Sequence, residues 1–368
     1  MRRCEVIVVG AGPAGVVTAI AARRRGFQAA VLDARTPPID RPCGEGILPQ
    51  GVAALAALGI VLPQEFTFPF RGIRFVDGEY SARADFAGAA GCSIRRVKLH
   101  QFLVNEAVQA GVEFHWGARV KHFGRDCVNT AREAFSYRWL VGADGQNSQV
   151  RKWAGLAPRS GRRKRFGFCT HFQTSPWSDA TEVHWGRGCQ IFVTPMAGQE
   201  VGMAVLSGDP GLRLEGALSQ FPALAERLHG AARTTRELGE TTGLRILPAI
   251  ARGRVALVGD ASGTVDAVTG HGLSLAFHQA IALVEAMRQG DLSHYQRAHK
   301  KMASVPITMT RLMTLMSRND WIRARTIRLF QNSPELFSRM LAIHTESASL
   351  SSFGLAEIAG FGWKFLRT

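Results

Sequence analysis

Residues 6–33, VIVVGAGPAGVVTAIAARRRGFQAAVLD, contain the pattern that decides the fold. Apolar runs at 5–9 and 28–33 predict two buried strands, and the segment 14–25 between them predicts a helix that ends before Gly26. A strand–helix–strand connection of this kind joins parallel strands. We therefore predict an α/β protein with a Rossmann-like nucleotide-binding domain.

Three glycines in the turn after the first strand have separate tasks. Gly10 permits the tight turn, Gly12 lets the backbone approach a pyrophosphate, and Gly15 allows close contact between helix and strand. The helix N-terminus then offers unpaired amides to phosphate oxygens. Asp33 ends the second strand, where a carboxylate can accept hydrogen bonds from ribose hydroxyls. These features predict a dinucleotide site but leave open whether it holds a nicotinamide or a flavin.

A second strand-to-helix segment, RVALVGDASGTVDAVTGHGLSLAF at 254–277, favours a flavin. Asp260 follows a buried strand, where its carboxylate can accept from a polyol hydroxyl. Residues 270–272, Gly-His-Gly, open a predicted helix over 272–289 and let backbone amides approach the edge of a flat ring. Because the positive end of the helix dipole favours negative charge at that edge, a reduced flavin fits the segment.

Three stretches together resemble the FAD-dependent oxidoreductases with the fold of p-hydroxybenzoate hydroxylase and geranylgeranyl reductase. They are GAGPAG at 10–15, VGADGQNSQVR at 141–151 and VGDASGTVDAVTGHG at 258–272, and they occur in the family's order. The resemblance implies non-covalent FAD, with NAD(P)H as a transient reductant. It also implies a set of cofactor-contacting residues: Gly10, Gly12, Pro13, Ala14, Gly15, Asp33, Ala34, Arg35, Cys43, Gly44, Arg96, Val120, Asp144, Gly145, Gly259, Asp260, Gly270, His271, Gly272 and Leu273.

The remaining pattern predicts how the chain is divided. Alternating apolar and polar residues around Asp77-Gly78 predict a β-hairpin over 72–87, and further β runs follow between 165 and 207. We predict a discontinuous FAD-binding domain, an inserted antiparallel substrate-binding sheet and a helical C-terminal region. The FAD-binding domain comprises residues 1–65, 96–160 and 250–290. The substrate-binding sheet comprises residues 66–95 and 161–249, and the helical region comprises residues 291–368.

The composition excludes several classes of protein. Six scattered cysteines have no zinc-ligand or redox-motif spacing, which predicts reduced thiols, no metal site and a cytoplasmic protein. The net charge of +16 is accompanied by no nucleic-acid-binding motif, so we predict no nucleic-acid partner. A basic surface suits anionic cofactors, acyl carriers or lipid headgroups. The uncharged run at 6–22 contains a glycine-rich turn, so we predict no transmembrane helix, and a strand starting at Glu5 leaves no room for a signal peptide.

Cys43 and His271 are candidate catalytic residues at the flavin. The segment RPCGEGILPQG at 41–51 resembles the cysteine–glycine segment of the geranylgeranyl reductase branch. Cys43 is either a reactive thiolate, with Arg41 as its local positive neighbour, or a small buried side chain. His271 stands where that branch commonly has glutamate. A protonated His271 could stabilise the anionic reduced flavin, whereas a neutral one would fill the loop.

His171 is the third catalytic candidate. It lies on a predicted strand of the substrate sheet, FGFCTHFQ, and could deprotonate or orient a phenol. A lone histidine on a strand more often satisfies a local hydrogen bond, and the same alternative applies to His184 and His278.

Two enzymatic functions are consistent with these residues. The first is an FAD-dependent monooxygenase that hydroxylates an aromatic or lipid-like phenolic substrate through a flavin C4a-hydroperoxide, reduced by NAD(P)H. The alternative is an FAD-dependent, geranylgeranyl reductase-like reductase of carbon–carbon double bonds, weakened because QIFVTP at 190–195 lacks that branch's tyrosine–tryptophan–phenylalanine–proline signature. A flavin-bearing interaction protein without catalysis is a third interpretation.

The C-terminal segments indicate the kind of substrate. Residues 309–337 mix apolar side chains with arginines, and residues 356–368 combine apolar side chains with two basic ones, which suits an interfacial helix or a cover over an apolar small molecule. Apolar stripes that pack on the FAD domain are the alternative. Peripheral contact of the protein with a membrane or an acyl carrier is therefore a further hypothesis.

Overall fold

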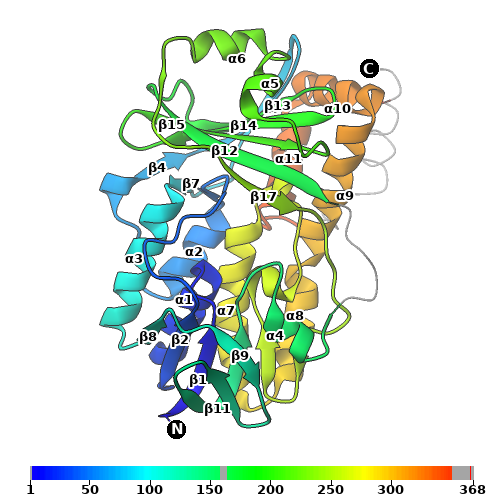
Figure 1. The fold of residues 1–368 in the computed structure, drawn as a ribbon. Helices are drawn as coiled ribbons and strands as arrows, with labels where there is room; N and C mark the ends of the chain where they lie inside the picture. Colours follow the sequence, from blue (N-terminus) through cyan, green and yellow to red (C-terminus); the bar gives the residue numbers. More distant parts are fainter. Residues whose placement is uncertain (1, 158–163, 350–364, 366–368) are drawn as a thin grey trace.

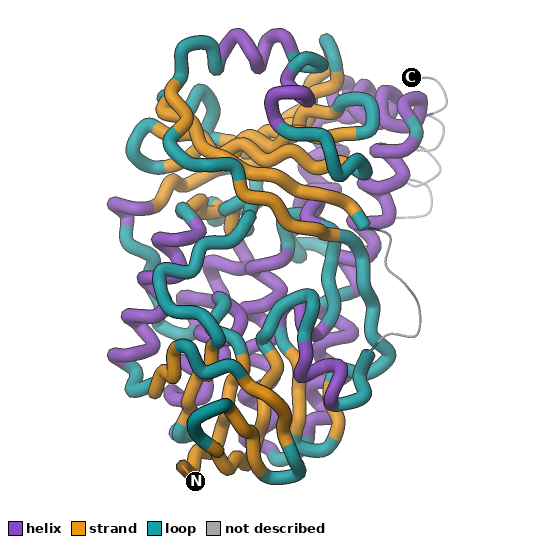
Figure 2. Tube along the Cα trace, in the orientation of Figure 1, coloured by secondary structure: helices purple, strands orange, loops and turns teal. Residues whose placement is uncertain are grey.

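The computed structural model describes residues 2–157, 164–349 and Phe365 (Figures 1 and 2). One β-sheet lies near the N-terminus and another lies at the opposite end of the molecule (Figure 1). Helices fill the space between the sheets, and the C-terminal helices run along one side of both (Figure 2).

The N-terminal sheet is built on parallel strands in the order β19-β11-β1-β2-β8, as the βαβ pattern predicts. The antiparallel strands β18, β9 and β10 extend it. Its strands are β1 (Arg2–Val9), β2 (Ala29–Asp33), β8 (Glu113–Trp116), β9 (Val120–Phe123), β10 (Cys127–Thr130), β11 (Ala134–Gly142), β18 (Ala251–Arg252) and β19 (Val255–Leu257). The first strand starts at Arg2 rather than Glu5, because its pairing with β11 continues to Phe135.

Helices α1 (Pro13–Arg24), α3 (Arg96–Gln109) and α7 (Gly272–Gln289) pack with this sheet into the largest apolar core. The predicted helix over 272–289 is confirmed in both bounds. Close packing of α1 depends on two glycines. A Cβ on Gly15 would lie 1.9 Å from the carbonyl oxygen of Gly10, and a Cβ on Gly10 would lie 2.4 Å from that of Ala143. Gly10 also has a φ of 109°, which side chains rarely tolerate.

The second large sheet has the order β16-β12-β15-β14-β13-β5-β6, with β17 paired to β12. All pairs are antiparallel except β5 with β13. Its strands are β5 (Gly72–Asp77), β6 (Tyr80–Asp85), β12 (Arg165–Gln173), β13 (Ala180–Trp185), β14 (Cys189–Met196), β15 (Glu200–Ser207), β16 (Ala232–Arg233) and β17 (Leu238–Thr242). The predicted hairpin at Asp77-Gly78 is confirmed.

A small sheet joins the two halves. Strand β7 (Gly91–Ile94) pairs with both β3 (Gly46–Ile47) and β4 (Thr67–Phe70). The segment predicted as the first part of the substrate sheet therefore supplies strands to two sheets. The division of the chain into domains remains a prediction.

The remaining helices cover the edges of these layers. They are α2 (Pro49–Ala57), α4 (Gln149–Trp153), α5 (Leu214–Leu218), α6 (Pro222–Arg227), α8 (Leu292–Met302), α9 (Ser304–Arg318), α10 (Asp320–Asn332) and α11 (Pro334–His344). Helices α10 and α11 pack on β5 and β6 around the aromatic rings of Phe75, Phe330 and Phe337. Within the described ranges, no helix is both long and apolar enough to cross a membrane. All six cysteines are free thiols, and the described residues form no metal-binding cluster.

Candidate active site between the two sheets

A cavity of about 760 Å³ lies between the N-terminal sheet and the antiparallel sheet. One part, the cofactor lobe, is lined by the ends of β1 and β2, by the residues that follow β11 and β19, and by residues 41–46. The other part, the apolar lobe, is lined by side chains from the antiparallel sheet and the C-terminal helices. These include Phe70, Phe75, Val183, Phe192, Leu206, Val268, Met309, Leu312, Met313, Met316, Phe330, Phe337, Met340 and Leu341.

The cofactor residues implied by the resemblance gather in the cofactor lobe. All of them line the cavity except Gly15 and His271. Gly15 instead contacts the strand–helix turn, as its tight approach to Gly10 shows. Asp33 lies at the end of β2, where its two carboxylate oxygens accept hydrogen bonds from the amides of Ala11, at 2.7 Å, and Arg35, at 2.8 Å. These bonds fix the carboxylate beside the glycine turn.

The cofactor lobe has the space and the polar groups that FAD requires. A Cβ added to Gly12, Gly145 or Gly270 would meet no atom within 4 Å, so the backbone there is open to a ligand. Arg96 is buried, and its Nη1 makes no hydrogen bond to a described residue. Burial lowers the pKa of Arg96, which is the signature of an undercompensated cation. Oδ1 of Asp144 is also buried without a partner among the described residues. A ligand that places an anionic group beside Arg96 and a hydrogen-bond donor beside Asp144 would give both side chains a partner.

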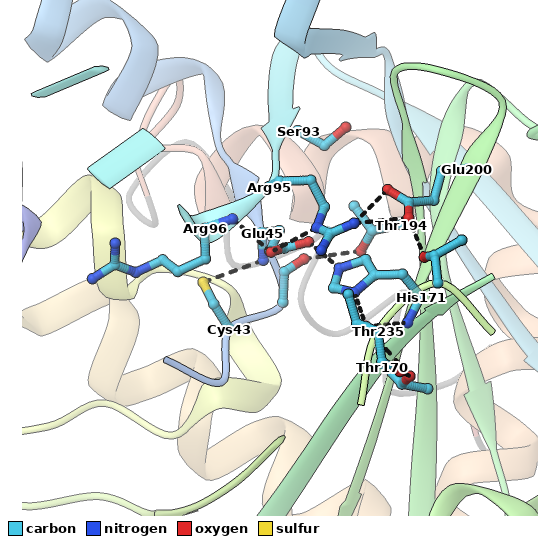
Figure 3. Close-up of polar contacts among 12 residues, drawn as sticks. Cys43, Glu45, Ser93, Arg95, Arg96, Thr170, His171, Thr194, Glu200 and Thr235 are labelled. Atoms are coloured by element: carbon cyan, nitrogen blue, oxygen red, sulfur yellow. Dashed lines mark hydrogen bonds and ion pairs between the residues drawn. The ribbon is translucent and has the colours of Figure 1, made fainter. Parts of the chain in front are cut away.

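Glu45 is a functional candidate that sequence reasoning missed. It is 5% exposed and has a φ of 60°, unusual for a side chain other than glycine. Its Oε1 accepts a hydrogen bond from the backbone amide of Arg96 at 2.6 Å (Figure 3). Its Oε2 lies 2.5 Å from Nε2 of His171 on β12. The available signal was the single charged residue, between Gly44 and Gly46, in the run PCGEGILPQG at 42–51.

Further polar contacts attach the loop at residues 41–46 to the antiparallel sheet (Figure 3). Nη1 of Arg95 lies 2.7 Å from both carboxylate oxygens of Glu200, and Nε of Arg95 lies 3.9 Å from Oε1 of Glu45. The hydroxyl of Thr194 donates to the carbonyl of Gly44 at 3.0 Å. We call Glu45, Arg95, His171 and Glu200 the buried clamp, because together they join the cofactor-lobe loop to the sheet.

The predicted role of His171 as a group that touches a phenol is not supported by its position. Both of its ring nitrogens are occupied, Nε2 by Glu45 and Nδ1 by the hydroxyl of Thr235 at 2.8 Å. His171 is buried and is not among the residues that line the cavity. Its influence on the cavity therefore runs through Glu45. His184 pairs with Glu182, and His278 with the carbonyl of Gln50.

The surroundings of His271 favour the second of its two interpretations, a neutral imidazole that fills the loop, over a protonated one. Its Nε2 lies 2.8 Å from the carbonyl oxygen of His344, and the two imidazole rings pack at 4.3 Å. Burial lowers the pKa of His271 to about 4. Burial, together with His271, lowers the pKa of His344 well below its usual value. The pair supports the N-terminus of α7 without carrying charge at neutral pH.

Cys43 lies in the cofactor lobe as a thiol rather than a thiolate. Burial raises the pKa of Cys43, and the nearby charge of Arg96 opposes this only in part. Arg41, the expected positive neighbour, instead forms an ion pair with Glu240 at 2.8 Å. The sulfur accepts a hydrogen bond from the amide of Glu45 at 3.2 Å. These contacts fit the small buried side chain better than the reactive nucleophile.

The apolar lobe presents no charged side chain among the residues named above as lining it. Three methionines of α9, Met309, Met313 and Met316, form one wall, and Phe192 of β14 forms part of another. Methionine is flexible and polarisable, so such a wall adapts to irregular apolar shapes.

Comparison with known proteins agrees with this architecture. A family model described as an FAD binding domain matches residues 3–290. The chain is 26% identical over 325 residues to a menaquinone reductase of Mycobacterium tuberculosis, covering 78% of each chain. It is 26% identical over 395 residues to a kynurenine 3-monooxygenase of Salinispora arenicola, covering 93% of this chain and 85% of that one. The crystal structure of p-nitrophenol 4-monooxygenase PnpA from Pseudomonas putida DLL-E4 has the same fold, with a TM-score of 0.80 at 18% identity over 94% of this chain and 98% of that one.

Proposed function

This chain belongs to the family of flavoproteins that share the FAD binding domain and is an FAD-dependent oxidoreductase, and from that premise we propose an NAD(P)H-dependent monooxygenase. Its substrate is an apolar aromatic or lipid-like phenolic compound. The reaction consumes the substrate, O₂, NAD(P)H and one proton, and yields the hydroxylated substrate, NAD(P)⁺ and water.

One observation carries the proposal. The cofactor lobe and the apolar lobe are parts of one cavity, so a substrate held by the methionines and aromatic rings lies next to the cofactor residues. Bound FAD supplies the electrons that activate O₂. The chain's own residues do the rest. Arg96 and the amides at Gly12, Gly145 and Gly270 would hold the cofactor, and the apolar walls would exclude water from the reacting atoms.

The proton chemistry of the cavity favours oxygenation over double-bond reduction. Reduction of an isolated double bond needs a group that gives a proton to the substrate carbon. The carboxylate of Glu45 is held by Arg96 and His171, and His344 is neutral. Both residues line the cavity, but neither is held as a free acid there, whereas hydroxylation of an electron-rich ring needs no proton on a substrate carbon.

Reduction of carbon–carbon double bonds is the second candidate. It is favoured by the relative named menaquinone reductase, which matches this chain over most of both lengths. The apolar side chains of that lobe suit an isoprenoid chain as well as they suit a phenol. The discriminating test must therefore offer both reactions on one molecule.

A phenol that carries an isoprenoid chain provides this test. The FAD-loaded enzyme is given the prenylated phenol with NADPH or NADH under ¹⁸O₂, and the product is analysed by mass spectrometry. A product with one ¹⁸O atom supports the monooxygenase. A product with two added hydrogens and no label overturns it in favour of the reductase. Controls in H₂¹⁸O with ordinary O₂ exclude an oxygen derived from water.

A further inference from the structure

A stripe of apolar and basic residues lies on the exposed side of α9 and at the start of α10. Leu312 is 37% exposed, Leu315 47% and Trp321 53%. Arg311 and Arg318 are also exposed. We call these five residues the mouth stripe. Both helices belong to the group that flanks the antiparallel sheet (Figure 1).

Helix periodicity connects this stripe to the apolar lobe. Residues 311, 315 and 318 recur at helical spacing and face outward, whereas Met309, Met313 and Met316 face inward and line the lobe. Leu312 lies at the boundary between these two faces. It is both exposed and part of the cavity wall, so the apolar lobe reaches the surface there.

The charge of the stripe is positive. Arg311 and Arg318 flank the exposed leucines, and the guanidinium of Arg325 lies 4.6 Å from the centre of the Trp321 ring. The neighbouring acid, Asp320, is paired with Arg323 at 2.6 Å. Arginines around exposed leucine and tryptophan side chains are typical of segments that lie in the headgroup region of a membrane.

We propose that the mouth stripe docks on an anionic lipid bilayer, and that the substrate passes from the bilayer into the apolar lobe at Leu312. The proposal rests on the apolar substrate of the proposed function. An apolar molecule resides in lipid rather than in water, so an entrance that is itself in the lipid interface avoids an aqueous step. The net charge of +16 adds a long-range attraction to the same surface.

The test measures binding of the full-length, FAD-loaded protein to vesicles. Sedimentation with phosphatidylglycerol vesicles is compared with phosphatidylcholine vesicles, at low and high salt. Two variants remove the stripe's chemistry separately: Arg311→Gln with Arg318→Gln, and Leu315→Gln with Trp321→Gln. Matched controls are Arg125→Gln with Arg132→Gln, exposed residues in the two turns on either side of β10 in the N-terminal sheet, and Val108→Gln, which removes an exposed apolar residue of α3.

We expect salt-sensitive binding to the anionic vesicles. Each arginine near an anionic surface contributes about fivefold in partitioning, so the double arginine variant should bind roughly 25-fold more weakly. The leucine–tryptophan variant should also bind weakly, and the controls should bind like the unaltered protein. Equal binding by stripe and control variants overturns the proposal, as does failure of the unaltered protein to bind phosphatidylglycerol.

A second measurement separates this proposal from the proposed function. Turnover of a prenylated phenol is measured once in detergent micelles and once in phosphatidylglycerol vesicles. Docking predicts that the stripe variants lose turnover only with vesicles. Normal vesicle turnover in the stripe variants overturns the docking surface and leaves the function standing. Vesicle binding that depends on the stripe, without turnover of any phenol, overturns the function instead. If the stripe variants lose turnover of an acyl-carrier-bound phenol but not of a phenol in vesicles, the partner of the stripe is an acidic protein, and the bilayer proposal is overturned.

Discussion

The two lobes of the cavity are built in opposite ways. Backbone turns at the ends of parallel strands form the cofactor lobe, and side chains from distant segments form the apolar lobe. A backbone turn tolerates few residue types, whereas an apolar wall tolerates many. Changes in the cofactor lobe should therefore act on folding and FAD binding, and changes in the apolar lobe on substrate choice alone.

The largest effect is expected at the contact between α1 and β1. Gly15→Val places a side chain within 1.9 Å of the Gly10 carbonyl, so α1 cannot pack and the protein should not accumulate in folded, FAD-loaded form. Gly12→Ala is the matched change, because its Cβ meets no protein atom. That variant should fold normally and bind FAD more weakly, as measured by circular dichroism and by the flavin absorbance of the purified protein. Equal FAD content in Gly12→Ala and the unaltered protein would show that the turn is not the pyrophosphate site.

The buried clamp should show the next largest effect. Glu45→Gln leaves His171 without its carboxylate, while Arg95 keeps its ion pair with Glu200, and breaking a buried pair such as Glu45–His171 costs about 3 kcal/mol in free energy of unfolding. Glu182→Gln, in the buried pair with His184, should cost a similar amount. Only Glu45→Gln should also change the flavin spectrum and FAD affinity, since only Glu45 holds Arg96. Denaturant unfolding and FAD titration together check both statements.

Acid should destabilise the protein through His271. Its pKa is about 4 in the folded protein and 6.5 when unperturbed, so the unfolded chain takes up the proton first. Stability is unaffected by this group above pH 7 and is lost as the pH falls from 6.5 to 4, by up to about 3 kcal/mol. His271→Gln should flatten that part of the pH profile of unfolding. A profile of unchanged steepness would assign the acid sensitivity to other groups.

A substitution of Arg96 should weaken FAD binding without lowering the stability of the FAD-free protein. Arg96→Met removes a buried cation whose Nη1 has no partner among the described residues, so the FAD-free protein should lose little or no stability. FAD affinity should fall about 10- to 100-fold, because a charge-assisted hydrogen bond contributes about 1.5–3 kcal/mol. Thermal unfolding with and without added FAD measures both effects. A large loss of stability without FAD would contradict the assignment.

The smallest effect is expected in the apolar lobe. Met313→Leu keeps the volume of a buried side chain and should cost less than about 1.5 kcal/mol in free energy of unfolding. FAD affinity should not change, while the preference among phenols of different chain length should shift. A changed FAD affinity would show that the lobes are not independent.

Sequence reasoning located the cofactor lobe because its signals are local. The glycines, Asp33 and the start of α7 are each recognised within one strand–turn–helix segment, and the structure places them together at the sheet's edge. The contact between Glu45 and His171 spans 126 positions, so no local pattern announces it. The same holds for the small sheet of β3, β7 and β4, whose strands are two to four residues long. Residues 356–368, predicted as an interfacial or covering segment, lie outside the described residues apart from Phe365.

The left-handed backbone of Glu45 has a consequence for how this position can vary. A residue other than glycine in that conformation stores about 1–2 kcal/mol of strain. Glycine at position 45 would remove this strain, but it would also remove the carboxylate that contacts His171 and Arg95. Two requirements therefore conflict at position 45. The backbone conformation favours glycine, whereas the side-chain contacts require glutamate. The presence of glutamate means that the ionic contacts stabilise the protein by more than the strained backbone destabilises it.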